Sequence, residues 1–244
     1  MSKVISLLIL GLSLNISSCN QAKDQETLRF ATSAEYPPFE YNDHGAIKGF
    51  DIALAQLIAQ KLGKKAVFDN IQFSTVLPAV NSGQDDIAIS TITITTDRQK
   101  NFDFSEPYYF EAMALIYKNH SELKNPAALG GKKIAVQLGS VMELWLRQKY
   151  PTNELVAFDN NNQAIEALIA DHVDAVLVDG VQGAVFSKKH PHLSYAIIGK
   201  ANAGYGLALK KGSPLTAQIN QALQQLRASG ALKQLELQWI KGEL

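Results

Sequence analysis

The stretch Asp51–Gly63, with the sequence DIALAQLIAQKLG, decides the fold class of this chain. Its apolar residues recur three or four positions apart, which is the spacing of one buried helix face, and Gly63 is a typical stop signal. Asp51 is a typical capping residue, so we expect it to begin the helix. Leu28–Thr32 before the helix and Lys65–Phe68 after it have the length and composition of strands. A strand, a helix and a strand in this order predict a parallel βαβ unit.

The alternation of strands and helices continues on both sides of an interruption. Ser74–Ser82 is expected to form a helix and Asp86–Ile89 a strand, which completes a first β-α-β-α-β module. Residues 119–132 contain Pro126 and a glycine pair and are expected to form a loop. The other expected elements are the strands Met113–Tyr117, Ile134–Gln137, Leu155–Phe158, Ala175–Val178, Leu193–Ile198 and Tyr205–Leu209, and the helices Val141–Tyr150, Gln163–Ala170, Val181–Lys189 and Ser213–Arg227, the last resuming to Trp239 after Gly230. Two such modules predict an α/β protein with two lobes, each a mostly parallel sheet flanked by helices, and a ligand cleft between them.

Composition excludes several classes of protein. The chain has 244 residues with 23 Lys+Arg against 23 Asp+Glu, so it lacks the basic surplus of a nucleic-acid-binding protein. Its hydrophobic content of 46% is too high for a disordered chain. The single cysteine excludes an intramolecular disulfide and a multi-cysteine zinc site. We expect neither a metal nor a cofactor, because the histidines have no third ligand nearby and no phosphate-binding, nucleophile-elbow or zinc-protease motif occurs.

The first 26 residues carry the signs of export. Val4–Leu14 is an apolar run too short to span a ~30 Å hydrocarbon layer and is typical of a secretory signal. It is followed by Ile16–Cys19, ISSC, which resembles the bacterial lipobox. We therefore expect residues 1–18 to be a lipoprotein signal peptide, Cys19 to carry lipid, and the polar residues 19–26 to form a flexible tether. The alternative is an ordinary signal peptide with an incidental cysteine, which would give a soluble periplasmic protein.

Three groups of residues indicate a site for a small charged ligand. Ser90–Arg98, STITITTDR, brings hydroxyls and backbone N–H groups into a turn that ends in an arginine, which can bind a carboxylate through two parallel hydrogen bonds. Gln137–Val141, QLGSV, runs from a strand through glycine into a helix, whose free N–H groups form a second anion site. Asp179 follows an apolar strand and either caps a helix or opposes a bound cation. Together they favour a zwitterion, although a polar capped turn alone would also explain the first group.

Six motifs occur in order along the chain and point to a family. They are YPPFEY at 36–41, GFDIALA at 49–55, TITTDR at 93–98, FDFSEPYY at 102–109, QLGS at 137–140 and YGLALKKGS at 205–213. In this order they resemble the polar amino-acid solute-binding proteins of ABC importers, the arginine-, glutamine- and histidine-type periplasmic binding proteins. The resemblance implies a type II two-lobe periplasmic-binding-protein fold with hinge strands near Leu115–Lys118 and Lys200–Gly204. Lobe 1 would then comprise residues 27–115 and 204–244, and lobe 2 residues 119–199.

The resemblance also implies roles for the site residues. Arg98 and the backbone N–H groups of Thr93 and Val141 would bind the α-carboxylate of an amino acid. Asp179 would bind the α-ammonium together with Thr91 and Thr93. The complete set of expected ligand-binding residues is Ser33, Glu35, Tyr36, Phe73, Ser90, Thr91, Thr93, Arg98, Gln137, Ser140, Val141 and Asp179.

The side-chain end of the expected site favours arginine or another polar amino acid. Tyr36 and Phe73 would sandwich the ligand side chain, and aromatic faces suit a guanidinium through cation–π contact worth about 0.5–2 kcal/mol. Ordinary core packing is the alternative for both rings. Gln137 matches a position that is often glutamine in arginine-preferring relatives. Relatives that bind cationic ligands often carry an acid at the position of Ser33, so serine there speaks against lysine, although Glu35 could substitute.

The expected function is capture of the amino acid by lobe closure and its delivery to a permease in the inner membrane. We expect a monomer that is not an enzyme, anchored on the periplasmic side through Cys19. A cyclohexadienyl or arogenate dehydratase on the same fold is the alternative, because some relatives have that activity. It needs a cleft acid of raised pKa, for which Glu35 is the only candidate. The sensor domain of a receptor is disfavoured, because no apolar segment long enough to span a membrane follows the body.

Overall fold

The computed structural model describes residues 27–121, 123, 125–199 and 203–241. The expected signal peptide, tether and lipidation site at Cys19 lie outside the described residues, as do positions 200–202 of the expected second hinge. No helix in the described part of the chain is long and apolar enough to cross a bilayer.

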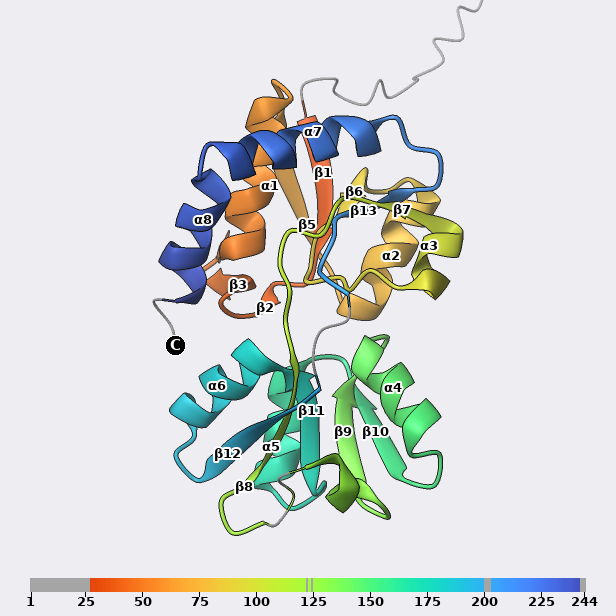
Figure 1. Cartoon of the computed structure of the whole chain (residues 1–244), viewed down its shortest axis with the longest axis vertical. Helices are drawn as coiled ribbons and strands as arrows, with labels where there is room; N and C mark the ends of the chain where they lie inside the picture. The colour runs from red at the N-terminus through yellow and green to blue at the C-terminus, as the bar shows by residue number, and fades with distance from the viewer. Residues whose placement is uncertain (1–26, 122, 124, 200–202, 242–244) are drawn as a thin grey trace, which may run out of the picture.

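The chain forms two lobes that follow one another along the long axis of the molecule (Figure 1). Lobe 1 contains β1 (Thr27–Thr32), β2 (Glu35–Tyr36), β3 (Glu40–Asp43), β4 (Ala46–Lys48), α1 (Phe50–Lys61), β5 (Lys65–Asn70), α2 (Phe73–Ser82), β6 (Ile87–Ala88), α3 (Thr96–Asn101), β7 (Phe102–Phe104), β13 (Ala208–Lys210), α7 (Leu215–Ala228), α8 (Ala231–Leu235) and a π-helical turn (Glu236–Ile240). Lobe 2 contains β8 (Met113–Lys118), a 3-10 turn (Pro126–Leu129), β9 (Lys133–Gln137), α4 (Val141–Lys149), β10 (Glu154–Phe158), α5 (Asn161–Ile169), β11 (Ala175–Asp179), α6 (Gly180–Lys189) and β12 (Leu193–Gly199). The expected two-lobe α/β architecture is confirmed.

Both main sheets are mixed, whereas the sequence pattern predicts mostly parallel ones. The strand order is β5-β1-β6-β13-β7 in lobe 1 and β10-β9-β11-β8-β12 in lobe 2. The strands of the βαβ units pair in parallel, but β13 and β8 pair antiparallel with both of their neighbours. The difference arises because β8 enters lobe 2, and β13 re-enters lobe 1, directly from the other lobe. Neither strand arrives through a crossover helix, which is the connection that a parallel pair requires.

The helix that decides the fold class begins differently from the prediction. α1 starts at Phe50 with Gly49 as its N-cap, so the expectation that Asp51 begins and caps the helix is wrong. The N–H groups of Phe50 and Asp51 donate to the carbonyls of Pro38 and Phe39 at 3.0 and 2.8 Å, so backbone carbonyls satisfy the helix start. Gly49 has φ 127°, and a Cβ there would collide with the Phe39 carbonyl.

The first crossing between the lobes lies earlier in the chain than predicted. β8 pairs with β11 on one side and β12 on the other, so the expected hinge strand Leu115–Lys118 lies inside the lobe 2 sheet. Tyr109 still bridges to Tyr205 in lobe 1. The crossing therefore occupies residues 110–112, and the expected end of lobe 1 at residue 115 is six residues too late. An apolar run buried on both sides is typical of a central strand, and that is what β8 is.

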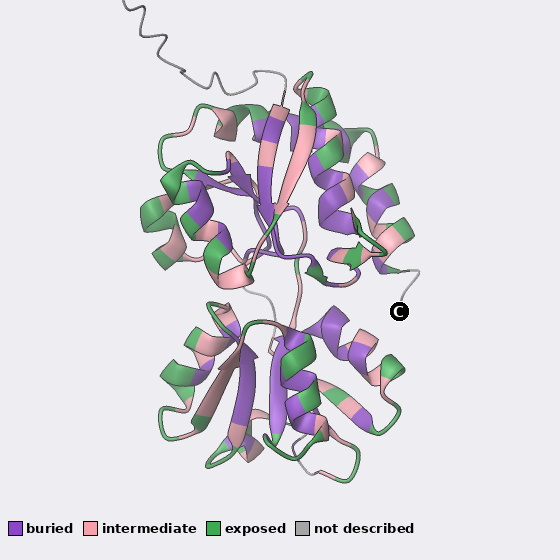
Figure 2. Cartoon of the chain, turned by 180° about the vertical axis from the view of Figure 1, so that it is seen from behind, coloured by how far each residue is buried: buried purple, intermediate pink, exposed green. Residues whose placement is uncertain are grey.

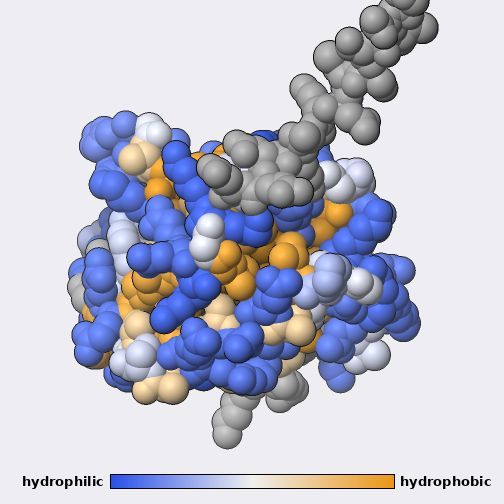
Figure 3. Space-filling model, turned by 90° about the horizontal axis from the view of Figure 1, so that it is seen from above, coloured by the Kyte–Doolittle hydropathy of each residue, from blue (hydrophilic) through white to orange (hydrophobic). Residues whose placement is uncertain are grey.

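Each lobe has its own hydrophobic core around its sheet. In lobe 1, α1, α7 and α8 cover one face and α2 the other, with Phe30, Leu54 and Leu223 fully buried. In lobe 2, α5 and α6 pack on one face and α4 on the other. Figure 2 shows buried strands at the centre of both lobes and exposed residues on the outward faces of the helices. The end of lobe 1 seen in Figure 3 is mainly hydrophilic, with apolar residues in the hollows.

Candidate functional site

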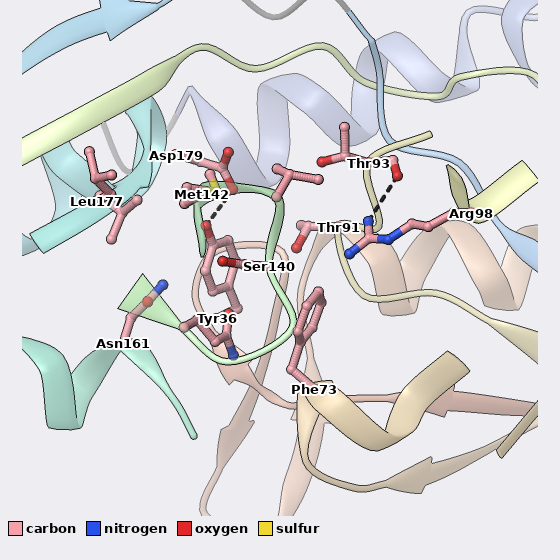
Figure 4. Close-up of a pocket in the computed structure, with 13 residues that line it drawn as sticks. Tyr36, Phe73, Thr91, Thr93, Arg98, Ser140, Met142, Asn161, Leu177 and Asp179 are labelled. Carbon is pink, nitrogen blue, oxygen red and sulfur yellow. Dashed lines mark hydrogen bonds between the residues drawn. The ribbon is translucent and has the colours of Figure 1, made fainter. Parts of the chain in front are cut away.

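A cavity lies between the two lobes and is lined by both (Figure 4). Lobe 1 contributes Tyr36, Phe73, Thr91, Thr93 and Arg98, and lobe 2 contributes Gln137, Ser140, Val141, Met142, Asn161, Leu177, Val178 and Asp179. A ligand bound in this cavity would therefore contact both lobes.

The cation of the cavity is the guanidinium of Arg98. Thr95 caps α3 by accepting the Arg98 N–H on Oγ1 at 3.2 Å, which fixes the start of the helix. Arg98 Nη1 donates to the Thr93 carbonyl at 2.9 Å, and Nη2 donates across the cleft to the Gly139 carbonyl at 3.0 Å. Burial lowers the pKa of Arg98 to about 10, so the group stays charged at neutral pH. A guanidinium has more N–H groups than these two bonds use, and the rest can bind an anion.

The start of α4 adds a second set of donors from lobe 2. Ser140 is the N-cap, and its Oγ accepts the Glu143 N–H at 3.2 Å. The Gly139 N–H donates to Glu143 Oε2 at 2.8 Å. The first N–H groups of a helix have no partner within the helix, so those of Val141 and Met142 are suited to bind an anion at the cavity.

The acid of the cavity is Asp179, at the end of β11. It stands at the N-cap position of α6, but its side chain makes no capping hydrogen bond. Instead Asp179 Oδ2 accepts from Tyr36 Oη at 2.5 Å, across the cleft (Figure 4). Burial raises the pKa of Asp179 to about 6. Of the two roles that the sequence left open, the geometry therefore favours a partner for a cation.

The two expected aromatic residues both border the cavity. Tyr36 is buried and packs against Phe39, with 6.2 Å between ring centroids. Phe73 is the first residue of α2 and packs at the edge of the lobe 1 core. Each ring therefore packs on the core with one side and lines the cavity with another, and its contact with a ligand side chain stays a prediction.

Three expected site residues, Ser33, Glu35 and Ser90, lie outside the cavity. The N–H of Ser33 donates to Ser90 Oγ at 3.1 Å, and this hydroxyl donates to Glu40 Oε1 at 2.8 Å, so both serines belong to a buried network. Glu35 lines a separate groove with α5. Its neighbour Tyr36 faces inward, and successive side chains of a strand point to opposite faces.

The sequence interpretation missed four residues of the cavity wall: Met142, Asn161, Leu177 and Val178. Met142 directly follows two expected site residues, and Leu177 and Val178 directly precede Asp179, so proximity along the chain was an available signal. Asn161 lies in the run DNNN at 159–162. This composition is typical of a loop, and the predicted helix begins only at Gln163. In the structure Asn160 caps α5 by accepting the Gln163 N–H at 3.0 Å, so the helix begins at Asn161, two residues before the predicted start.

Two buried acids, Glu40 and Asp51, lie behind Thr91, on the side away from the cavity. Asp51 Oδ2 accepts from the Thr91 N–H at 2.8 Å and from Tyr108 Oη at 2.7 Å. Thr91 has φ 47°, a conformation that costs energy outside glycine and here is held by Asp51. Burial, together with the charge of Asp51, raises the pKa of Glu40 well above its usual range, and burial raises that of Asp51 to about 7. Two ionised carboxylates buried close together would repel each other, so the pair favours holding a proton at neutral pH.

Comparisons with known proteins identify the family of the chain. The model of the bacterial extracellular solute-binding proteins, family 3, matches residues 28–242. The chain is 31% identical over 232 residues to the arginine-binding extracellular protein ArtP of Bacillus subtilis (strain 168), covering 93% of this chain and 91% of that protein.

Two solved structures give the same picture. An ancestral arginine-binding protein bound to arginine has a TM-score of 0.84 at 35% identity, covering 88% of this chain and 98% of that one. An ancestral amino-acid-binding protein, described as a precursor of cyclohexadienyl dehydratase, has a TM-score of 0.82 at 32% identity, covering 88% of this chain and 96% of that one. These similarities confirm the two-lobe periplasmic-binding-protein fold that the motifs imply.

Proposed function

The chain belongs to the bacterial extracellular solute-binding proteins of family 3, and from this premise we propose that it captures a polar amino acid for an ABC importer. The observation that carries the proposal is the charge pattern of the cavity. Arg98 and the start of α4 present N–H donors, and Asp179 presents a buried acid, on walls of one small cavity. This pattern matches the carboxylate and ammonium of a zwitterion.

The ligand would act by stabilising the closed arrangement of the lobes. Its carboxylate would contact Arg98 of lobe 1 and the α4 start of lobe 2, and its ammonium would contact Asp179. The direct bonds that join the lobes across the cleft include Arg98 to Gly139 and Tyr36 to Asp179. A ligand that contacts both lobes only in the closed state shifts the equilibrium toward that state by its differential affinity.

Arginine is the ligand that we propose first. ArtP is named as an arginine-binding protein, and an ancestral relative was solved with arginine bound. The rings of Tyr36 and Phe73 border the cavity, as a cation–π contact with a guanidinium requires. Gln137 lines the same cavity. Ser33 and Glu35 do not line the cavity. The acid that a lysine side chain would need is therefore absent from position 33, and Glu35 is not placed to replace it.

We further propose export as a monomeric lipoprotein that delivers its ligand to a membrane permease from the periplasmic face. The support is the family, whose description is extracellular, and the apolar run that ends in ISSC at Cys19. A Cys19→Ser variant should leave the membrane fraction of the cell and collect in the soluble periplasmic fraction. Membrane retention of that variant would contradict lipid anchoring.

The dehydratase alternative has less support. Its candidate acid, Glu35, lines a groove apart from the cavity, so it is not placed to protonate a ligand there. The similar ancestral protein is itself described as amino-acid-binding. Turnover of arogenate or prephenate by the purified protein would contradict the binding role.

A thermal-shift panel of the twenty amino acids tests the proposed function. A ligand at 100 times its Kd adds about 2.7 kcal/mol of stability, so a true ligand raises the melting temperature clearly. We expect arginine to give the largest shift. The proposal fails if no amino acid raises the melting temperature.

A further inference from the structure

Asn161, the first residue of α5, has an unused hydrogen-bond acceptor in the cavity wall. The residue is 2% exposed, and its Oδ1 has no donor within the described part of the chain. Native proteins rarely leave a buried amide oxygen unpaired, because the group loses its water without gaining a partner. The unpaired oxygen therefore indicates a donor that comes with a ligand.

The sequence of α5 explains how this amide reaches the cavity. Ala164, Ile165 and Leu168 form the apolar face of the helix and are buried in the lobe 2 core. Asn161 lies three and four positions before the first two of these, so it is on the same face one turn earlier. At that point the face passes from the core to the cavity. Figure 4 shows the amide projecting from the start of α5 toward the side of the cavity where Tyr36 lies.

A second amide carbonyl lies in the same wall. Gln137, at the end of β9, donates from Nε2 to the Asp159 carbonyl at 3.3 Å. With Nε2 committed to this bond, the Oε1 of Gln137 is left to accept from a ligand. β9 and α5 therefore present two neutral acceptors from lobe 2, and the rings of Tyr36 and Phe73 border the cavity from lobe 1.

No acid near the cavity is available to bind a ligand group at the wall formed by Asn161 and Gln137. Asp179 is the one carboxylate in the cavity wall as the described residues define it, and the proposed function assigns it to the ligand ammonium. Asp159 Oδ2 accepts from Gln72 Nε2 across the cleft at 3.2 Å. Glu40 is buried outside the cavity and accepts from the Ser90 hydroxyl at 2.8 Å. The end of the ligand side chain therefore meets neutral amides and aromatic faces.

We propose that Asn161 is a specificity-determining residue that accepts a hydrogen bond from a planar N–H group at the end of the ligand side chain. Guanidinium, ureido and carboxamide groups share this chemistry. The inference rests on the proposed function, because it requires an amino acid in the cavity. An apolar side chain would leave both amides unpaired, and a site built for hydrogen bonds rejects such a ligand strongly.

Calorimetry with four amino acids and three variants tests the inference. Arginine, citrulline and glutamine carry the three planar groups, and norvaline carries none. Asn161→Leu keeps the number and branching of the side-chain heavy atoms and removes the acceptor, so it should weaken the best of the first three roughly tenfold or more. Its affinity for norvaline should change by less than about threefold. Asn162→Leu is the matched control, since Asn162 is exposed at the next helix position, and it should leave every affinity unchanged.

The remaining variant, Asn161→Asp, places a negative charge at position 161. It should raise the ratio of arginine to citrulline affinity about tenfold or more, because a carboxylate favours the cation over its neutral analogue. Equal losses for norvaline and the donor-bearing ligands in Asn161→Leu, or an unchanged ratio in Asn161→Asp, would overturn the inference while the proposed function stands. Failure of the wild type to bind any amino acid would overturn the proposed function, and the inference with it.

Discussion

Arg98 stays charged despite its burial, because its pKa of about 10 is still well above neutral pH. Arg98→Ala would bury the ligand carboxylate without its charge-assisted pair, so we expect a loss of about 2–5 kcal/mol in binding free energy, measured by calorimetry. Lys100→Ala is the matched control: it removes the same charge from α3, but Lys100 is exposed and pairs with Asp97 at 2.6 Å outside the cavity. Near-native affinity in Arg98→Ala would contradict the assigned role.

Asp179 makes ligand binding depend on pH in a direction that its pKa fixes. With the lobes in contact, as the structure has them, burial raises this pKa to about 6, so below that pH the carboxyl carries a proton that an incoming ammonium must displace. The Kd should therefore rise as pH falls below about 6, by up to tenfold per unit. Glu111 lies near Asp179 and has its pKa raised by burial to about 7, so its ionisation strengthens the same trend.

The measurement is calorimetry between about pH 5 and pH 8, in two buffers of different ionisation enthalpy. Proton release on binding near pH 6 is expected. Asp179→Asn cannot titrate, so its weaker binding should lose most of this dependence. A Kd that improves as the pH falls would contradict the assignment.

At the scale of elements, Asp51 joins α1 to Thr91, in the segment that follows β6. Asp51→Ala would leave two buried donors, the Thr91 N–H and Tyr108 Oη, without their acceptor. We expect the free energy of unfolding to fall by about 2 kcal/mol or more. Urea denaturation should show a lower midpoint with an unchanged slope.

Asp43→Ala is the matched control for this variant. Asp43 is partly exposed and pairs with Lys48 at 2.7 Å, and surface pairs contribute less than about 1 kcal/mol. Equal midpoints for Asp51→Ala and Asp43→Ala would show that the hydrogen bonds of Asp51 do not stabilise the fold as proposed.

Periodicity predicted where the elements lie, and contacts between distant residues decided how they begin. The apolar spacing of α1 is visible in the sequence, but its start depends on the Pro38 and Phe39 carbonyls, which no local pattern reveals. β8 is apolar because it is central in a sheet, and a sequence alone does not distinguish that from a buried hinge. In the same way, Arg98 and Asp179 were predictable from chemistry at strand ends, whereas Asn161 required the fold to place α5 beside the cavity.

At the scale of the molecule, function depends on contact between two lobes that are joined by two crossings (Figure 1). Ser74, the second residue of α2, faces Gly139 across the cleft, so that even a Cβ on Gly139 would lie 3.5 Å from the Ser74 Cα. Neither residue lines the ligand cavity. A large side chain at position 74 would therefore hold the lobes apart and leave the ligand contacts chemically intact.

Ser74→Trp should weaken amino-acid binding more than about tenfold, because the ligand could contact both lobes only by expelling the indole. Small-angle scattering should show the wild type becoming more compact with ligand and the variant failing to do so. Thr75→Trp is the matched control, since Thr75 is exposed at the next position of α2 and should close and bind like the wild type. Tight binding by Ser74→Trp without compaction would mean that one lobe suffices, and capture by closure would then be wrong.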